Sequence, residues 1–298
     1  MCMTCGCGDE TNIRVSAVAE PSGALLPGHL HVHPHAHGSE HEHDHPHEHG
    51  PDHDHDHEHA HAHAHAHQPE TIPLEQSLLA KNELLAARNR GWLEGRGIRA
   101  LNVMSSPGAG KTTLLVRTLA DLGGRLRAGV VEGDQETSLD ADRIRAVGRP
   151  VVQINTGAGC HLDADMLRRA LDALDPQTGS TVFIENVGNL VCPALFDLGE
   201  AAKVVVVSVT EGDDKPQKYP HMFSAADLVI INKSDLLPYV DFDVDGFRRR
   251  ARQINPHTDF LVLSATTGEG LAGWYDWLGE ANSRSSTLTG SLTDTLSP

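Results

Sequence analysis

Short apolar, β-branched runs alternate with amphipathic runs through most of the chain. Seven apolar runs predict strands, at Ala100–Met104, Ala128–Glu132, Val151–Ile154, Thr181–Glu185, Lys203–Val209, Leu228–Asn232 and Phe260–Leu263. Apolar positions at helical spacing predict helices at Leu74–Leu93, Thr112–Leu122, Ala164–Leu174, Asp245–Ile254 and Gly270–Ala281. Continuous apolar runs such as Val204–Val207 are typical of strands covered on both faces. The alternation predicts an α/β fold, a mainly parallel sheet flanked by helices.

The pattern stops near both ends of the chain. Residues 71–282 are predicted to form one globular domain. Residues 1–70 contain no aromatic residue and are rich in His, Gly, Pro and Ala, so they cannot bury enough apolar surface to fold. They are predicted to be a disordered metal-binding arm, and the polar residues 283–298 a disordered tail.

Charge is concentrated in the same arm. The formal net charge is −17, and residues 1–80 hold 13 acidic residues against the single basic Arg14. A polyanion is repelled by phosphate backbones and anionic lipid, which excludes general nucleic-acid or membrane-surface binding. No apolar run approaches the ~20 residues that span a bilayer, and the first residues lack the pattern of a signal peptide. We expect a cytoplasmic protein.

A glycine-bearing loop follows the first apolar strand of the domain, with the sequence SSPGAGKTT. Such P-loops turn backbone N–H groups toward phosphate oxygens, place a lysine on the β- and γ-phosphates, and place a hydroxyl on Mg²⁺. Ser105 stands where the pattern has its first glycine. The predicted nucleotide-binding residues of the loop are Gly108, Ala109, Gly110, Lys111, Thr112 and Thr113.

The segment Asn232-Lys233-Ser234-Asp235 closes a late apolar strand and predicts the base. A carboxylate at Asp235 can accept from both N1–H and the N2 amino group of guanine, a donor pair that adenine lacks. The Asn232 amide suits the N7/O6 edge, the Lys233 stem can lie along the ring, and Ser264-Ala265 can supply a backbone N–H to O6. GTP is therefore predicted rather than ATP.

Two carboxylates at strand ends are candidates for holding Mg²⁺ with Thr112. Asp134 lies in the segment VVEGDQET, and Glu185 ends another strand. Residues 133–138 occupy the position at which P-loop proteins commonly change conformation with the nucleotide.

Cys160, His161 and Cys192 follow strand ends, where a parallel sheet presents its binding crevice. Two thiolates and an imidazole can bind Zn²⁺ or Ni²⁺ with a fourth position open. The alternative is two buried structural cysteines and a surface histidine.

The arm carries two further candidate metal-binding segments. Cys2, Cys5 and Cys7, with nearby backbone nitrogens, favour Ni²⁺, although Zn²⁺ would also bind and exposed redox-active thiols are an alternative. The stretch His29–His67 holds 18 of the 21 histidines and is predicted to load several ions weakly, as storage or buffering. A solvated coil with incidental binding is the alternative.

The motifs GAGKTT, EGDQET, GCHLDAD, ENVGNLVCP, EGDDKPQKYP and NKSD occur in this order. With the Cys tip, they make the chain resemble the HypB family, the nickel-incorporation GTPases of [NiFe]-hydrogenase maturation. The resemblance implies a homodimeric P-loop GTPase of the signal-recognition (SIMIBI) class. It implies a tight Ni²⁺ site at Cys2, Cys5 and Cys7 and a weaker Ni²⁺/Zn²⁺ site at Cys160, His161 and Cys192. HypA is the implied partner and the hydrogenase large subunit the recipient.

We therefore expect a GTP-hydrolysing nickel metallochaperone with catalytic residues Lys111, Thr112, Asp134 and Glu185. Lys215 and Lys218 are candidates for further phosphate or cross-dimer contacts. Turnover should be slow, because no sequence feature identifies an arginine finger or a water-positioning residue. The alternatives are a nickel or zinc storage protein with a regulatory GTPase domain, and a urease-type nickel GTPase.

Overall fold

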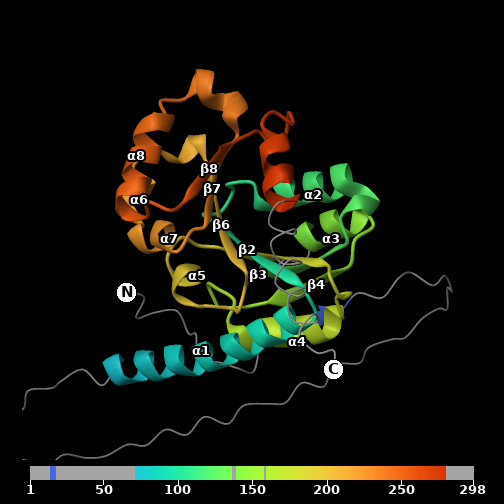
Figure 1. Ribbon diagram of the computed structural model, residues 1–298. Helices are drawn as coiled ribbons and strands as arrows, with labels where there is room; N and C mark the ends of the chain where they lie inside the picture. The colour runs from blue at the N-terminus through green and yellow to red at the C-terminus, as the bar shows by residue number, and fades with distance from the viewer. Residues whose placement is uncertain (1–13, 18–70, 136–138, 158, 280–298) are drawn as a thin grey trace, which may run out of the picture. The chain divides into compact units, whose positions relative to one another are not determined.

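An eight-stranded sheet forms the centre of the protein, which we describe from a computed structural model (Figure 1). The structure describes residues 14–17, 71–135, 139–157 and 159–279. The strand order is β1-β4-β3-β5-β2-β6-β7-β8. The strands are β1 (Arg14–Ala17), β2 (Arg99–Ser105), β3 (Ala128–Asp134), β4 (Val151–Asn155), β5 (Thr181–Gly188), β6 (Ala202–Ser208), β7 (Leu228–Asn232) and β8 (Asp259–Val262).

Strands β2 to β8 run parallel to one another and confirm all seven strands expected from the sequence. The remaining strand, β1, pairs antiparallel with β4, with Arg14 opposite Asn155 and Ala17 opposite Val152. It was not predicted: Ile13, Val15 and Ala17 alternate with Arg14 and Ser16 as in a strand, but this run is short and stands in residues 1–70, whose composition predicted disorder. The sheet is therefore α/β as expected, with one short antiparallel strand added at its edge.

The helices lie between the strands. The described helices are α1 (Thr71–Gly95), α2 (Lys111–Leu122), α3 (Leu139–Ala146), α4 (Ala164–Leu174), α5 (Cys192–Leu195), α6 (Lys215–Lys218), α7 (Pro220–Ser224) and α8 (Val244–Ile254), and residues 271–279 are also helical. All five helices expected from the sequence are present. The charged helix α3 was not predicted, since only Ala141 and Ile144 of its residues are buried. No helix among the described residues is long and apolar enough to cross a membrane.

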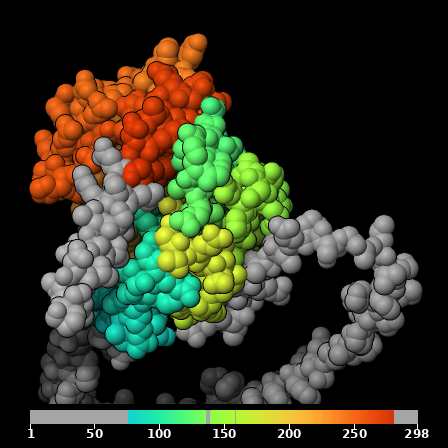
Figure 2. All heavy atoms as spheres, turned by 45° about the vertical axis from the view of Figure 1, so that its right-hand side comes forward, coloured from blue at the N-terminus to red at the C-terminus, as the bar shows by residue number. Residues whose placement is uncertain are grey.

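Both faces of the sheet are covered, as the continuous apolar strands predict. Val204 and Val206 of β6 pack in the cluster that contains residues of α2, α3 and the helix at 271–279. Val205 and Val207 face the other way, where α7 and α8 cover the sheet. Helices α1 and α4 adjoin on this second face, where their atoms lie side by side in cyan and yellow (Figure 2).

The parallel arrangement brings the carboxyl ends of the strands to one edge of the sheet. Strand β2 lies between β5 and β6, and β3 pairs with β5. The loop after β2, the end of β3 at Asp134 and the end of β5 at Gly188 therefore share that edge. This edge holds the pocket described next.

Candidate functional site: a phosphate pocket beside a thiolate–imidazole cluster

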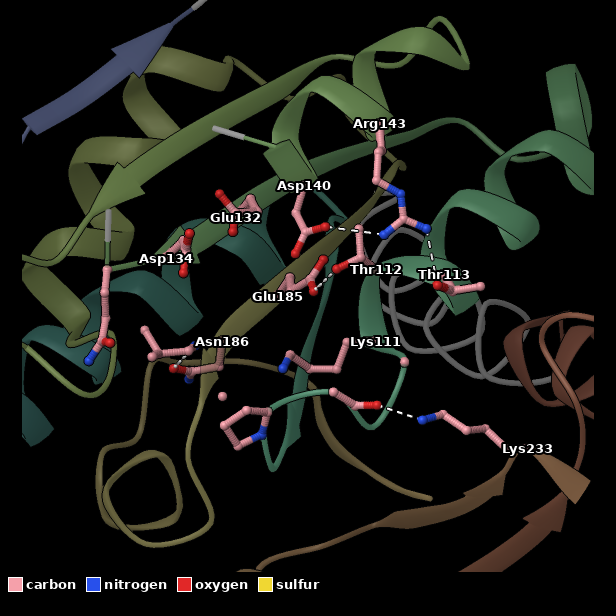
Figure 3. Close-up of a pocket in the computed structure, with 17 residues that line it drawn as sticks. Lys111, Thr112, Thr113, Glu132, Asp134, Asp140, Arg143, Glu185, Asn186 and Lys233 are labelled. Carbon is pink, nitrogen blue, oxygen red and sulfur yellow. Dashed lines mark hydrogen bonds and ion pairs between the residues drawn. The ribbon is translucent and has the colours of Figure 1, made fainter. Parts of the chain in front are cut away.

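The loop between β2 and α2 lines a pocket of about 470 Å³ (Figure 3). Gly110 caps α2 at φ +101°, and a Cβ there would lie 2.5 Å from Nδ2 of Asn232. Only glycine fits this position. The pocket is lined by Pro107, Gly108, Gly110, Lys111, Thr112, Thr113, Glu132, Gly133, Asp134, Gln135, Asp140, Arg143, Glu185, Asn186, Val187, Gly188 and Lys233.

Lys111 is buried in this loop at the start of α2. Its Nζ donates a hydrogen bond of 2.8 Å to Oγ of Ser105. Ser105 thus supplies an acceptor for the ammonium from the position where the usual motif has glycine. Burial lowers the pKa of Lys111, while nearby carboxylates, Glu185 first among them, oppose that shift. A buried cation at a helix N-terminus favours the binding of phosphate groups.

Thr112 donates a hydrogen bond of 2.6 Å to Oε1 of Glu185. Oε2 of Glu185 and Oε2 of Glu132 are buried without a hydrogen-bond partner. Burial raises the pKa of Glu185 to about 7 and that of Glu132 to about 9. At Glu132, repulsion from the carboxylates of Glu185 and Asp134 adds to the increase. Unpartnered carboxylate oxygens beside a hydroxyl are the oxygen donors that Mg²⁺ prefers. The residues present therefore fit a divalent cation.

Thr112, Asp134 and Glu185 all line this pocket, as the sequence predicts, whereas Glu132 was not predicted. Glu132 and Asp134 are two residues apart on β3, so strand alternation places both on the same face. That alternation was the signal that could have identified Glu132.

Arg143 of α3 also lines the pocket and was not predicted from the sequence. Its guanidinium donates to Oγ1 of Thr113 at 3.0 Å and pairs with Oδ1 of Asp140 at 3.1 Å (Figure 3). It adds positive charge to a wall that is otherwise rich in carboxylates. No sequence signal marks it, because Arg143 stands in a short charged helix with several other arginines.

The segment after β7 attaches to the phosphate loop. Asn232 is 2% exposed, donates to the carbonyl oxygen of Ala109 at 2.9 Å and accepts from the N–H of Ala265 at 3.1 Å. Lys233, at φ +63°, donates from Nζ to the carbonyl oxygen of Gly108 at 2.7 Å. Asn232 and Lys233 therefore hold the two loops together at the side of the pocket.

Two residues that were predicted to contact the guanine base use their backbone N–H groups within the protein instead. The N–H of Ala265 is engaged by Asn232, and the N–H of Ser264 donates to the carbonyl oxygen of Glu269 at 2.9 Å. Both backbone groups assigned to guanine O6 are thus used within the protein. Asp235 is half-buried in the short helix η4 (Ser234–Tyr239). The assignment of the base to Asp235, Ser264 and Ala265 stays a prediction.

A second cluster lies at Cys160, His161 and Cys192. The two Sγ atoms are 3.0 Å apart, and Sγ of Cys160 lies 3.6 Å from Nδ1 of His161. Within the described ranges this is the only group of three His, Cys, Asp or Glu residues whose ligand atoms all lie within 4.8 Å of one another. The donor set suits Zn²⁺ or Ni²⁺.

The environment of the cluster favours metal binding over the alternative of buried cysteines with a surface histidine. Both cysteines are half-buried, while His161 is 9% exposed and stacks on Phe196 at 3.9 Å between ring centroids. Burial lowers the pKa of His161, which favours the neutral imidazole that metals bind. The burial that this alternative describes is therefore not found, and metal binding at the cluster stays a prediction.

Two predicted lysines lie away from the pocket, and two predicted metal-binding segments lie outside the described residues. Lys215 pairs with Glu211 at 3.4 Å and Lys218 with Asp214 at 2.5 Å, and neither lysine lines the pocket. Cys2, Cys5 and Cys7, and the stretch His29–His67, lie outside the described residues.

Two hydrogen-bonded routes connect the pocket with the cluster. Directly after β3, Nε2 of Gln135 donates to the carbonyl oxygen of Gly159 at 3.4 Å. Oδ1 of Asn186 in β5 accepts from the N–H of Leu162 at 3.2 Å, and Asn189, directly after β5, donates to the carbonyl oxygen of Cys160 at 3.3 Å. Gln135 and Asn186 both line the pocket. The loop that carries Cys160 and His161 is therefore held by residues of the pocket.

Comparisons with known proteins agree with this geometry. Residues 99–262 match the family model "CobW/HypB/UreG, nucleotide-binding domain". The hydrogenase maturation factor HypB of Rhizobium leguminosarum bv. viciae is 58% identical over 211 residues, which cover 71% of each chain. The hydrogenase maturation factor HypB of Escherichia coli (strain K12) is 54% identical over 211 residues, 71% of this chain and 73% of that protein.

Among solved structures, the crystal structure of HypB from Helicobacter pylori in complex with nickel is similar, with a TM-score of 0.65. It is 40% identical, and the match covers 68% of this chain and 96% of that one.

Replacing Glu132 by Gln is expected to flatten the pH dependence of stability of the protein freed of nucleotide and metal. Because the pKa of Glu132 rises from 4.5 to about 9 on folding, the folded state holds a proton between these values that the unfolded state has released. Wild-type stability therefore falls as the pH rises through this range, and Glu132→Gln removes the contribution of Glu132. Urea denaturation across the range, with a chelator present, measures the slope.

Glu94→Gln is the matched control, since it removes one carboxylate from an exposed position and should keep the wild-type slope. A Glu132→Gln slope equal to that of wild type would show that the carboxyl of Glu132 is not destabilised by burial.

Proposed function

The chain belongs to the HypB family of hydrogenase maturation factors, and we propose that it binds Ni²⁺, hydrolyses GTP and delivers the metal to the large subunit of a [NiFe]-hydrogenase. The observation that carries this proposal is the hydrogen-bonded connection between the phosphate pocket and the cluster of Cys160, His161 and Cys192. A nucleotide binder and a metal binder need no such connection, whereas a GTP-controlled metal carrier does.

In this proposal the phosphate loop binds the triphosphate and Lys111 neutralises charge on the β- and γ-phosphates. Thr112, Asp134 and Glu185, together with Glu132, would hold Mg²⁺, which supplies further charge neutralisation at the phosphates when bound. Asp235 reads guanine, and Asn232 and Lys233 keep its segment against the phosphate loop. Turnover is slow, because Arg143, the one described arginine that lines the pocket, is paired with Asp140 and Thr113.

Ni²⁺ is the cargo and is held at Cys160, His161 and Cys192, a set that also suits Zn²⁺. Glu185 and Cys192 are both carried by the stretch from β5 to α5, and Asn186 and Asn189 of this stretch bond to the loop of Cys160. A change of position at Glu185 on nucleotide binding or hydrolysis therefore alters the spacing of the thiolates. Released metal passes to the hydrogenase.

We further propose that the chain is a cytoplasmic homodimer that works with HypA. Val191 and Leu195, on either side of Cys192, are 44% and 50% exposed, which supports an interface near the cluster. In the arm, Cys2, Cys5 and Cys7 form the tight Ni²⁺ site, and His29–His67 stores further ions.

Asp235→Asn is expected to exchange guanine for xanthine recognition. The variant keeps an acceptor for N1–H but presents an amide donor, which suits the C2 carbonyl of xanthine and opposes the C2 amino group of guanine. The mismatched contact is expected to cost about 3 kcal/mol of binding free energy, which weakens GTP binding about 100-fold. Calorimetric titration with GTP and xanthosine triphosphate tests this. Asp241→Asn, at an exposed position, is the control, and undiminished GTP affinity in Asp235→Asn would exclude Asp235 from the base site.

Complementation tests the whole function. In a bacterium that lacks its own HypB, the chain should restore [NiFe]-hydrogenase activity, while Lys111→Ala and Cys160→Ala should not at any nickel concentration. Removal of residues 29–67 should reduce activity only under nickel limitation.

Two outcomes of the same experiment favour other functions. If the chain without residues 29–67 still hydrolyses GTP but fails even with abundant nickel, metal storage is the main function. If the full chain restores urease rather than hydrogenase, it is a urease-type GTPase.

A further inference from the structure

The proposed metal site, on which this inference rests, is assembled from two separate loops. Cys160 and His161 precede α4, which begins at Ala164, and Cys192 begins the short helix α5. Neither loop is part of the sheet. Their relative position decides the distance between the two thiolates, and the bond from Asn189 to Cys160 is not the only contact that holds one loop against the other.

Asn82 of α1 contacts both loops with one side chain. Its Oδ1 accepts from the N–H of Ala164 at 2.9 Å, and its Nδ2 donates to the carbonyl oxygen of Asp197 at 2.7 Å. Ala164 lies three residues after His161, and Asp197 lies five residues after Cys192. The N–H of Ala164 is in the first turn of α4 and has no partner within the helix.

Asn89, two turns further along α1, repeats this bridge. Its Nδ2 donates to the carbonyl oxygens of Ala164 at 2.8 Å and Leu198 at 3.1 Å. Asn89 is 1% exposed and Asn82 is 6% exposed. Two asparagines seven residues apart share one face of a helix, and both join the same two loops.

Further contacts press the second loop onto α1. Gly199 has φ +87°, and a Cβ there would lie 2.4 Å from the carbonyl oxygen of Ala86. Arg90 forms an ion pair of 2.6 Å with Asp197. Phe196, the residue before Asp197, stacks on His161. The contacts of α1 therefore reach the proposed metal ligand His161 through Asp197 and Phe196.

We propose that Asn82 and Asn89 are positioning residues of the metal site. By fastening the loop of Cys160 and His161 to the loop of Cys192, they fix the separation of the ligands, and the docking of α1 sets the affinity for Ni²⁺. Groups that orient metal ligands typically change metal affinity 10- to 100-fold when they are removed.

Nickel titration of the full chain tests this proposal. Cys2, Cys5 and Cys7 are replaced by Ala, so that the thiolate-to-nickel charge-transfer absorption reports only Cys160 and Cys192. Asn82→Asp keeps the acceptor for Ala164 and loses the donor to Asp197, and Asn89→Leu loses both donors at similar volume. Each is expected to weaken Ni²⁺ binding about tenfold or more, with unchanged GDP affinity. Arg90→Met removes a partly exposed ion pair and leaves the core intact, and it should also weaken Ni²⁺ binding.

Asn255→Leu is the matched control. Asn255 also donates to two carbonyl oxygens, those of Ser224 and Ala226, and neither segment carries a metal ligand. It should lose thermal stability but keep the Ni²⁺ affinity. If Asn82→Asp, Asn89→Leu and Arg90→Met bind Ni²⁺ as tightly as the parent, the asparagines are structural only and the inference is wrong. If the parent itself shows no thiolate-to-nickel band, the proposed function fails at this site instead.

Discussion

Seven parallel strands end at one edge of the sheet, and this constraint creates both sites of the protein. The phosphate loop follows β2, Asp134 ends β3, Glu185 lies near the end of β5, and Asn232 ends β7. Parallel strands need crossover connections that cover both faces, which leaves only the strand ends open to a ligand. The thiolate–imidazole cluster adjoins the same edge because its ligands stand in the loops that leave β4 and β5.

The electrostatics of that edge explain why the pocket suits a charged ligand. Glu132 and Glu185 are buried there with raised pKa values, beside a buried Lys111 whose pKa is lowered. Buried charges cost free energy unless they are paired. A nucleoside triphosphate with a divalent cation brings negative charge to the lysine and positive charge to the carboxylates. The bound ligand therefore offsets the free-energy cost of burying both kinds of charged side chain. We therefore expect binding to act on Glu185, from which β5 continues toward Cys192.

Much of this architecture follows from local sequence. Strand ends, the phosphate loop and the cluster ligands could be predicted because apolar runs, a glycine-bearing turn and Cys–His spacing are local signals. The partners that individual side chains find in the folded protein could not be predicted in this way. Ser105 as the acceptor for Lys111, Asn232 as a link to Ala109, and Asn82 and Asn89 as bridges all depend on contacts across 6 to 123 residues of sequence. Arg143 lacked even a local signal, since a short charged helix resembles ordinary surface, and the alternation at strand β1 is too short to stand out from the arm around it.

The central claim is that nucleotide state and metal affinity are coupled through the strand ends. The most direct measurement uses the chain with Cys2, Cys5 and Cys7 replaced by Ala. Its affinity for Ni²⁺ is determined once with GDP and once with a non-hydrolysable GTP analogue, each with Mg²⁺. We expect the two affinities to differ at least about fivefold, and Ni²⁺ to change the GDP-to-analogue preference by the same factor, since coupling is reciprocal. Equal Ni²⁺ affinities in the two nucleotide states would contradict the account.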